Sequence, residues 1–235
     1  MHIDIWSDIA CPWCAIGREH ISQAARQFTS QQGTPDELTI RWRSFQLDSR
    51  APAKVEGDYV QLLANKYGMS RERSQGMMDA MVTRGAGLGV EFDFGKLQAG
   101  NTFDAHRLLH LAHHSGLQDE LKARLFQGYF AEGQLMADHD SLVALAVDVG
   151  LEEERVRAVL GSDEFADEVR QDQLIARQIG VTGVPFFVID ERIGLSGAQP
   201  PEVLVRALDK AWSMSSAEAL TEANAPGCGP DDCAV

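Results

Sequence analysis

Positive charge is scarce in this chain of 235 residues. It carries 21 Lys and Arg residues against 35 Asp and Glu residues, so its formal net charge at pH 7 is -14. A surface of that sign repels phosphate groups, which excludes nucleic acid and anionic membranes as main partners. The sequence also lacks an apolar run of the ~20 residues that span a membrane, and it opens on a strand-like segment without a signal-peptide pattern. We therefore expect a cytoplasmic protein.

Cysteine is also scarce, and its four copies are clustered. Four cysteines are too few for a disulfide scaffold of this size, and a composition of 44% apolar and 24% charged residues is that of an ordinary globular protein. The cysteines form two closely spaced pairs, Cys11 with Cys14 and Cys228 with Cys233. In a cytoplasmic chain, such pairs favour metal binding or catalysis over a structural disulfide.

The periodicity of apolar residues predicts a small α/β domain interrupted by helices. At the two ends of the chain it predicts a strand at 3–6, a helix at 12–28, strands at 38–45, 184–189 and 192–195, and a helix at 201–212. Between them it predicts helices at 58–67, 70–84, 102–115, 118–131, 141–149, 153–160 and 164–179. Glycines follow most of these helices, as is typical of helix C-termini. The pattern indicates a β-α-β unit and a β-β-α unit separated by an all-helical insertion.

The first cysteine pair lies where a strand gives way to a helix. A cysteine at a helix N-terminus has its thiolate favoured by the helix dipole and by unpaired backbone N–H groups. Cys14 follows Cys11 by one helical turn, and Pro12 suits the first turn because that turn needs no N–H from it. The spacing favours a redox dithiol. The same spacing also supplies two of the four ligands of a zinc site, so zinc binding stays open as an alternative at this point.

Three features in this order resemble the DsbA family of thioredoxin-fold proteins. They are Cys-Pro-Trp-Cys after a first strand, a long helical insertion, and Gly183-Val184-Pro185-Phe186-Phe187-Val188 at a late strand. The cytoplasmic FrnE-like branch looks most similar, since it often has the Asn-Thr-x-x-Ala-His-Arg segment that residues 101–107 match. The resemblance covers about residues 1–213. The expected organisation is an α/β, thioredoxin-like domain at 1–52 and 180–213, a helical insertion domain at 53–179, and a flexible tail at 214–235.

The resemblance implies roles for residues of both motifs. Cys11 would attack the substrate and form the mixed disulfide, and Cys14 would resolve it. Pro185 would follow a cis peptide bond and face the dithiol, while the backbone of Val184 pairs with an extended substrate. The implied activity is thiol-disulfide oxidoreduction or isomerisation, and the redox poise of the compartment decides its direction.

The dipeptide between the cysteines, Pro12-Trp13, differs from that of the family's strongest oxidants, which have histidine after the proline. Trp13 brings no charge to a thiolate. We therefore expect Cys11 to be activated mainly by the helix terminus and the pair to be less oxidising. In the family this dipeptide is exposed, so Pro12 and Trp13 are expected to contact substrates.

The second pair, Cys228 and Cys233, brackets a turn of glycine, proline and aspartates near the end of the chain. The broad DsbA pattern has no such pair. It could exchange disulfides with Cys11 and Cys14, lie idle, or complete a four-thiolate zinc site with them. A tail of this length reaches about 20 Å by the random-coil estimate, which favours exchange.

Two other functions stay open. One is a glutathione-dependent isomerase or transferase of the hydroxychromene carboxylate isomerase or kappa class, although those relatives have serine where Cys11 stands. The other is a zinc-binding or redox-sensing protein.

A histidine face with His106, His110, His113 and His114 is expected to be structural or solvated. The leading interpretation needs no cofactor or metal. It expects protein substrates with thiols or disulfides, together with a small-thiol or thioredoxin-type redox partner.

Overall fold

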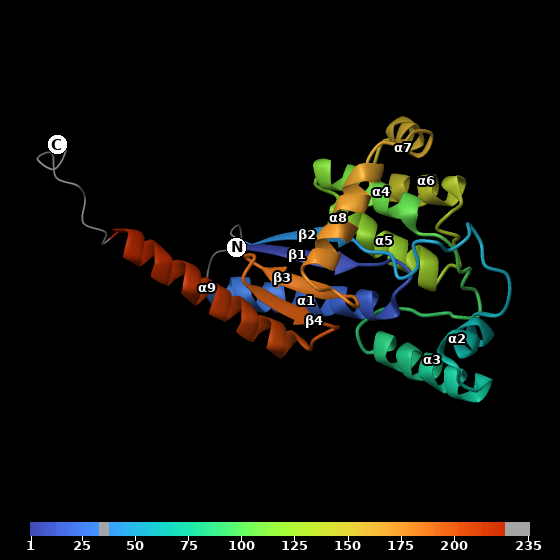
Figure 1. Cartoon of the computed structure of the whole chain (residues 1–235), viewed down its shortest axis with the longest axis horizontal. Helices are drawn as coiled ribbons and strands as arrows, with labels where there is room; N and C mark the ends of the chain where they lie inside the picture. The colour runs from blue at the N-terminus through green and yellow to red at the C-terminus, as the bar shows by residue number, and fades with distance from the viewer. Residues whose placement is uncertain (33–37, 224–235) are drawn as a thin grey trace, which may run out of the picture.

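The computed structural model describes residues 1–32 and 38–223. Figure 1 shows a small sheet at the centre, with helices grouped at one end of it. The strands are β1 (His2–Ser7), β2 (Thr39–Ser44), β3 (Phe186–Ile189) and β4 (Ile193–Ser196). The helices are α1 (Pro12–Gln32), α2 (Tyr59–Tyr67), α3 (Arg71–Ala86), α4 (Phe103–His114), α5 (Gln118–Phe130), α6 (His139–Asp148), α7 (Glu153–Leu160), α8 (Ala166–Gln178) and α9 (Pro201–Ala223).

The four strands form one mixed sheet in the order β2-β1-β3-β4. β1 runs parallel to β2 and antiparallel to β3, and β3 runs antiparallel to β4. A parallel neighbour requires a crossover, which α1 supplies. This arrangement, with a helical insertion between β2 and β3, confirms the expected α/β, thioredoxin-like fold.

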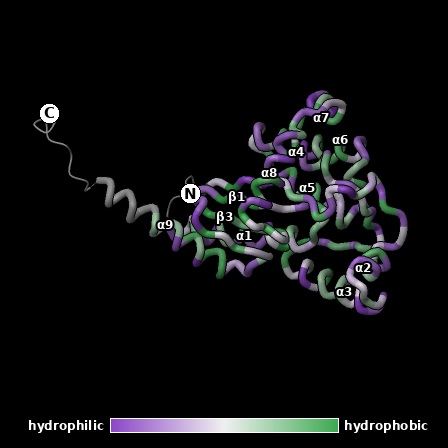
Figure 2. The backbone as a smooth tube through the Cα atoms, in the orientation of Figure 1, coloured by the Kyte–Doolittle hydropathy of each residue, from purple (hydrophilic) through white to green (hydrophobic). Residues whose placement is uncertain are grey.

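Successive side chains of a strand point to opposite faces of the sheet, and both faces of this sheet are buried. Ile3 and Ile5 of β1 face a core shared with α1 and α9, whereas Trp6 packs on the opposite face with residues of α8. The indole of Trp6 donates a hydrogen bond to the backbone oxygen of Asp172 at 2.9 Å, which ties α8 to the sheet. In Figure 2 the hydrophobic colour marks β3, while α7 at the outside carries both hydrophilic and hydrophobic segments.

The helical insertion has two unequal parts. Helices α4 to α7 pack around a large apolar core. Helices α2 and α3 pair with each other and are set apart from that group in Figure 1, although Val60 of α2 and Met78 and Met81 of α3 belong to the same core. The expected helices all form, with ends shifted by a few residues. The last helix is the exception: α9 continues to Ala223, so the expectation that it stops at Trp212 was wrong, and the rest of the expected tail, 224–235, lies outside the described residues. Its extension is rich in alanine and glutamate, which are strong helix formers.

Candidate active site

The first cysteine pair lies at the N-terminus of α1, at the end of the sheet where the helices gather. The carbonyl of Cys11 accepts the N–H of Cys14 at 2.9 Å, so the first helical turn orients both side chains. Cys11 is 4% exposed and Cys14 is fully buried, and neither forms a disulfide. Only Cys11 can therefore be approached from outside without opening the fold.

The loop before β3 comes close to Cys11. The peptide bond between Val184 and Pro185 is cis, as the resemblance implies, and the Cys11 thiol donates a 3.5 Å hydrogen bond to the Val184 carbonyl. Gly17 of α1 allows this approach, because a Cβ there would lie 2.8 Å from Cγ of Pro185. The need for glycine at position 17 cannot be seen in the sequence, since it arises only where the helix and the loop pack together.

The surroundings of the two thiols shift their pKa values in opposite directions. The hydrogen bond between the thiols, burial, and the charge of Cys14 raise the pKa of Cys11 well above its ordinary value. Burial also acts to raise the pKa of Cys14, but the hydrogen bond from Cys11, the Lys122 ammonium and the Ser7 hydroxyl bring it below its ordinary value. Groups other than the helix terminus therefore act on both thiols: Lys122 and Ser7 act on Cys14, and Cys14 acts on Cys11. That the helix terminus activates Cys11 stays a prediction.

Beneath Cys11 lies a buried carboxylate, Asp8, in the turn between β1 and α1. Its oxygens accept hydrogen bonds from the Leu47 N–H at 2.8 Å and the Thr102 hydroxyl at 2.9 Å. Nε2 of His106 lies 3.4 Å from the same carboxylate. Burial acts to raise the pKa of Asp8, but His106 and the two hydrogen-bond donors lower it below its ordinary value. Asp8 is therefore an anion that fixes the turn carrying the dithiol.

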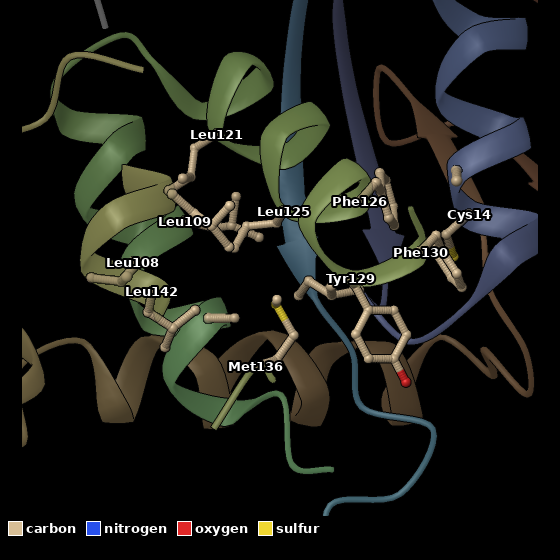
Figure 3. Close-up of a cluster of buried hydrophobic side chains, with 14 of the residues drawn as sticks. Cys14, Leu108, Leu109, Leu121, Leu125, Phe126, Tyr129, Phe130, Met136 and Leu142 are labelled. Atoms are coloured by element: carbon tan, nitrogen blue, oxygen red, sulfur yellow. The ribbon is translucent and has the colours of Figure 1, made fainter. Parts of the chain in front are cut away.

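A buried cation, Lys122 of α5, lies over the rings of Trp42 and Phe126. It is fully buried among apolar side chains, and burial lowers its pKa to about 8. Figure 3 draws the apolar cluster of this region, with Cys14 among its buried side chains. Sequence reasoning missed Asp8 and Lys122, because an acidic turn residue and a lysine on a mixed helix usually face solvent.

A cavity of about 730 Å³ opens on the Cys11 side. The cysteine turn, the loop before β3 and the α2–α3 pair surround it. Trp13 is 42% exposed at its edge, and the guanidinium of Arg84 from α3 lies 4.9 Å from the Trp13 ring centroid. The lining is mostly apolar, and its larger members include Tyr59, Leu63, Met77, Met78, Met81 and Tyr129. The cavity is therefore suited to apolar groups next to a reacting sulfur.

The remaining candidate residues lie away from the Cys11–Cys14 dithiol or outside the described residues. His110 is buried, and its Nε2 lies 3.1 Å from Ser44 Oγ and 3.3 Å from Asp172, so it joins α4 to β2 and α8. Cys228 and Cys233 lie outside the described residues. Within 1–32 and 38–223, no group of three or more His, Cys, Asp or Glu side chains could hold a metal ion. In the same ranges, every helix is too short or too polar to cross a membrane.

Comparison with known proteins adds three findings. The model of the DSBA-like thioredoxin domain matches residues 2–209. The crystal structure of a probable DsbA oxidoreductase from Streptomyces coelicolor is 40% identical, with a TM-score of 0.85, and the match covers 100% of this chain and 99% of that one. The uncharacterized protein YwbO of Bacillus subtilis is 27% identical over 210 residues, or 88% of this chain and 96% of that protein.

A more distant structure shares the fold. The cytosolic disulfide reductase DsbM of Pseudomonas aeruginosa, solved with GSH, is 17% identical with a TM-score of 0.63, and the match covers 91% of this chain and 100% of that one.

Proposed function

This chain belongs to the DSBA-like thioredoxin domain family, and from that premise we propose that it catalyses thiol-disulfide exchange on proteins and peptides. The observation that carries the proposal is the position of Cys11. Its sulfur is the accessible one of the pair, borders the apolar cavity, and touches the Val184 carbonyl. An extended substrate could pair with the backbone at Val184 while its sulfur meets Cys11.

In the proposed reaction, a substrate thiolate attacks the Cys11–Cys14 disulfide at Cys11. A bond forms between the substrate sulfur and Cys11, the bond to Cys14 breaks, and its electron pair stays on Cys14. A second thiol of the substrate then displaces Cys11, which leaves a substrate disulfide and a reduced pair. Run in reverse, the same steps reduce a substrate disulfide, and a mixed disulfide that returns to another cysteine of the substrate isomerises it.

The shape of the cavity favours substrates that present apolar side chains beside the reacting sulfur. Met77, Met78 and Met81 of α3 line it, and unbranched thioethers adapt to differently shaped partners. Arg84 and Lys66 add positive charge among these side chains. Unfolded or partly folded proteins meet this description, because their apolar segments are accessible.

We further propose cytoplasmic action and exchange with a small thiol or a thioredoxin-type partner. The acidic composition and the fold shared with a cytosolic disulfide reductase solved with GSH support this. We also propose that the Cys228–Cys233 pair re-oxidises or reduces Cys11 and Cys14 between turnovers, although α9 is helical up to Ala223, so that only the residues after Ala223 could provide the reach. A glutathione-dependent isomerase of the hydroxychromene carboxylate type fits less well, since its relatives have serine at the position of Cys11. Zinc content under reducing conditions would separate a four-thiolate zinc protein from these enzymes.

Turnover of a protein disulfide tests the proposed function. The reduced protein should accelerate insulin reduction with glutathione as electron donor, and Cys11→Ser should lower the rate to that of glutathione alone. Pro185→Thr should keep both thiols of the pair titratable yet slow turnover, because it changes the loop that faces the substrate. A wild-type rate equal to that of Cys11→Ser, with either glutathione or reduced thioredoxin as donor, would refute the proposal.

A further inference from the structure

Two cations line the cavity beside Cys11 without an acidic partner in the part of the chain that the structure describes. Arg84 of α3 lies over the Trp13 ring, with 4.9 Å between the guanidinium carbon and the ring centroid. Lys66 of α2 lies over the Tyr67 ring at 5.8 Å. Neither side chain forms a salt bridge or a hydrogen bond with a described residue. Because an aromatic ring carries no net charge, both cations are left without a neutralising anion.

The anions of the same lining are bound by the chain itself. Asp8 accepts hydrogen bonds from the Leu47 N–H at 2.8 Å and the Thr102 hydroxyl at 2.9 Å. Asp48, in the loop after β2, accepts the N–H of Arg50 at 3.0 Å. The two cations have only rings as partners. The lining therefore has more unused bonding capacity for an anion than for a cation.

Of the two cations, Arg84 is the one in contact with the cysteine turn. Its ring partner, Trp13, stands between Cys11 and Cys14 in the sequence and is 42% exposed at the edge of the cavity. A guanidinium carries N–H donors in a fixed fork that fits a carboxylate through two parallel hydrogen bonds. The Trp13 ring has no oxygen to accept these donors, so they stay available to a ligand. Arg84 therefore offers a carboxylate site on the rim of the cavity that the reacting sulfur borders.

We propose that Arg84 is a specificity-determining residue, which receives a carboxylate that the substrate carries close to its reacting cysteine. The inference rests on the proposed function and names its substrate class: polypeptide segments in which an acidic side chain accompanies the cysteine. The formal net charge of -14 repels such segments at long range. A cation beside the dithiol offsets this repulsion at the point where the two sulfurs must meet.

A single exchange step at Cys11 tests the proposal. In the full chain with Cys14→Ser, Cys228→Ser and Cys233→Ser, Cys11 is the only thiol. The probes are peptides that differ only in the residue beside their cysteine, which is glutamate, glutamine or lysine, and each cysteine is joined to a thiopyridyl group by a disulfide. The Cys11 thiolate attacks the peptide sulfur, a new S–S bond forms, and the thiopyridyl sulfur leaves with the electron pair of the broken bond. Absorbance of the released thiopyridone gives the rate, and the mass of the product confirms the peptide on Cys11.

The chain with Arg84 should react with the glutamate peptide at least about threefold faster than with the lysine peptide, as is typical of an exposed ion pair. Arg84→Glu should abolish or reverse this order, and Arg84→Lys should keep it with a smaller ratio. Added salt should shrink the ratio, because it screens the pair. The matched control is Arg73→Glu, which changes the net charge by the same amount on the same helix. Arg73 is exposed and does not line the cavity, so this variant should keep the ratio.

An unchanged ratio in Arg84→Glu would overturn the proposal, and so would an equal change in Arg73→Glu, which would show a long-range effect of net charge. Glutathione joined to the same thiopyridyl group distinguishes the source of the carboxylate, because it also carries carboxylates near a sulfur. A slower reaction of Arg84→Glu with both glutathione and the glutamate peptide would assign one carboxylate site to both. A loss confined to glutathione would overturn the assignment to polypeptide segments. Insulin turnover by the wild type is measured separately, so turnover without any dependence on Arg84 overturns this inference and leaves the proposed function standing.

Discussion

The two sulfurs of the dithiol, one helical turn apart, face different surroundings. Cys11 borders a cavity of about 730 Å³ whose α2–α3 wall presents exposed apolar side chains. Cys14 faces the closed core of α4 and α5, where Lys122 is buried. The open side is mostly apolar, whereas the closed side is buried and holds the charged Lys122. Under the proposed function, Cys11 would be the sulfur that meets substrates and Cys14 the sulfur shielded from them.

The attachment of the two sides differs as well. The closed side is tied to the sheet by Gln118, whose side-chain amide accepts the Trp42 N–H at 2.9 Å and donates to the Trp42 carbonyl at 3.0 Å. The α2–α3 wall contributes Arg84 above Trp13 and otherwise packs mainly on itself. We therefore expect substitutions on the open side to change substrate handling and those on the closed side to change ionisation and stability.

The largest expected effect separates the two cysteines. Cys14→Ser should accumulate stable mixed disulfides with substrate proteins, because Cys11 still reacts and nothing resolves the product. Cys11→Ser should trap almost none, since Cys14 is fully buried. Non-reducing gels and mass spectrometry of the trapped species measure this difference. Equal trapping by both variants would remove the distinction between an open and a closed sulfur.

The next effect concerns pH and the closed side. Burial lowers the pKa of Lys122 from 10.5 to about 8, so between these values the unfolded chain holds more protons than the folded one. The free energy of unfolding therefore rises with pH across this window, by up to ~3 kcal/mol. Below about pH 8 the lysine is charged in both states, and burying that charge lowers the free energy of unfolding by up to the same ~3 kcal/mol.

Lys122→Met should remove this dependence. In the reduced state the variant should be more stable than the wild type at about pH 7.5, and the advantage should shrink towards about pH 10. Urea unfolding of both proteins at the two pH values measures it. A constant difference between the two proteins would contradict the buried, depressed lysine. The surface variant Arg124→Met serves as the control and should show no such trend.

The smallest effect on stability is expected on the open side. Met77 and Val82 both belong to α3 and are 45% and 40% exposed, but only Met77 lines the cavity. Replacing either by glutamine should change the free energy of unfolding by less than about 0.5 kcal/mol. Met77→Gln should raise the KM for unfolded protein substrates several-fold, whereas Val82→Gln should not. Equal KM values for the two variants would show that substrates do not use the cavity.

The local sequence pattern predicted much of the fold. In the site, it predicted the cysteine turn but not the buried residues around it. The position of Cys11 and Cys14 at a helix start follows from a strand, a proline and helical periodicity, and these features are local. The approach of Pro185 to the dithiol came from the family resemblance, and the structure confirms the cis bond and the contact between Cys11 and Val184. The ends of most helices followed from glycines and apolar spacing.

The closed side could not be predicted, because it depends on packing between distant elements. Lys122 follows Asp119 and Glu120, so the start of its helix reads as a solvent-exposed surface. The packing of α5 against its neighbours buries it, with Trp42 of β2 among the side chains that cover it. The ionisation of the two thiols also depends on packing. The helix dipole is visible in the sequence, but the Lys122 ammonium and the Ser7 hydroxyl that act on Cys14 are not.

Alkylation of the reduced wild-type protein tests the central division most directly. A limiting amount of iodoacetamide, followed by peptide mass spectrometry, reports how fast each cysteine reacts in the folded state. The structure predicts that Cys11 is modified at least about tenfold faster than Cys14, even though its pKa is the higher of the two, because access to the sulfur limits the reaction. Modification of Cys14 at the same rate as Cys11, or faster, would contradict the account.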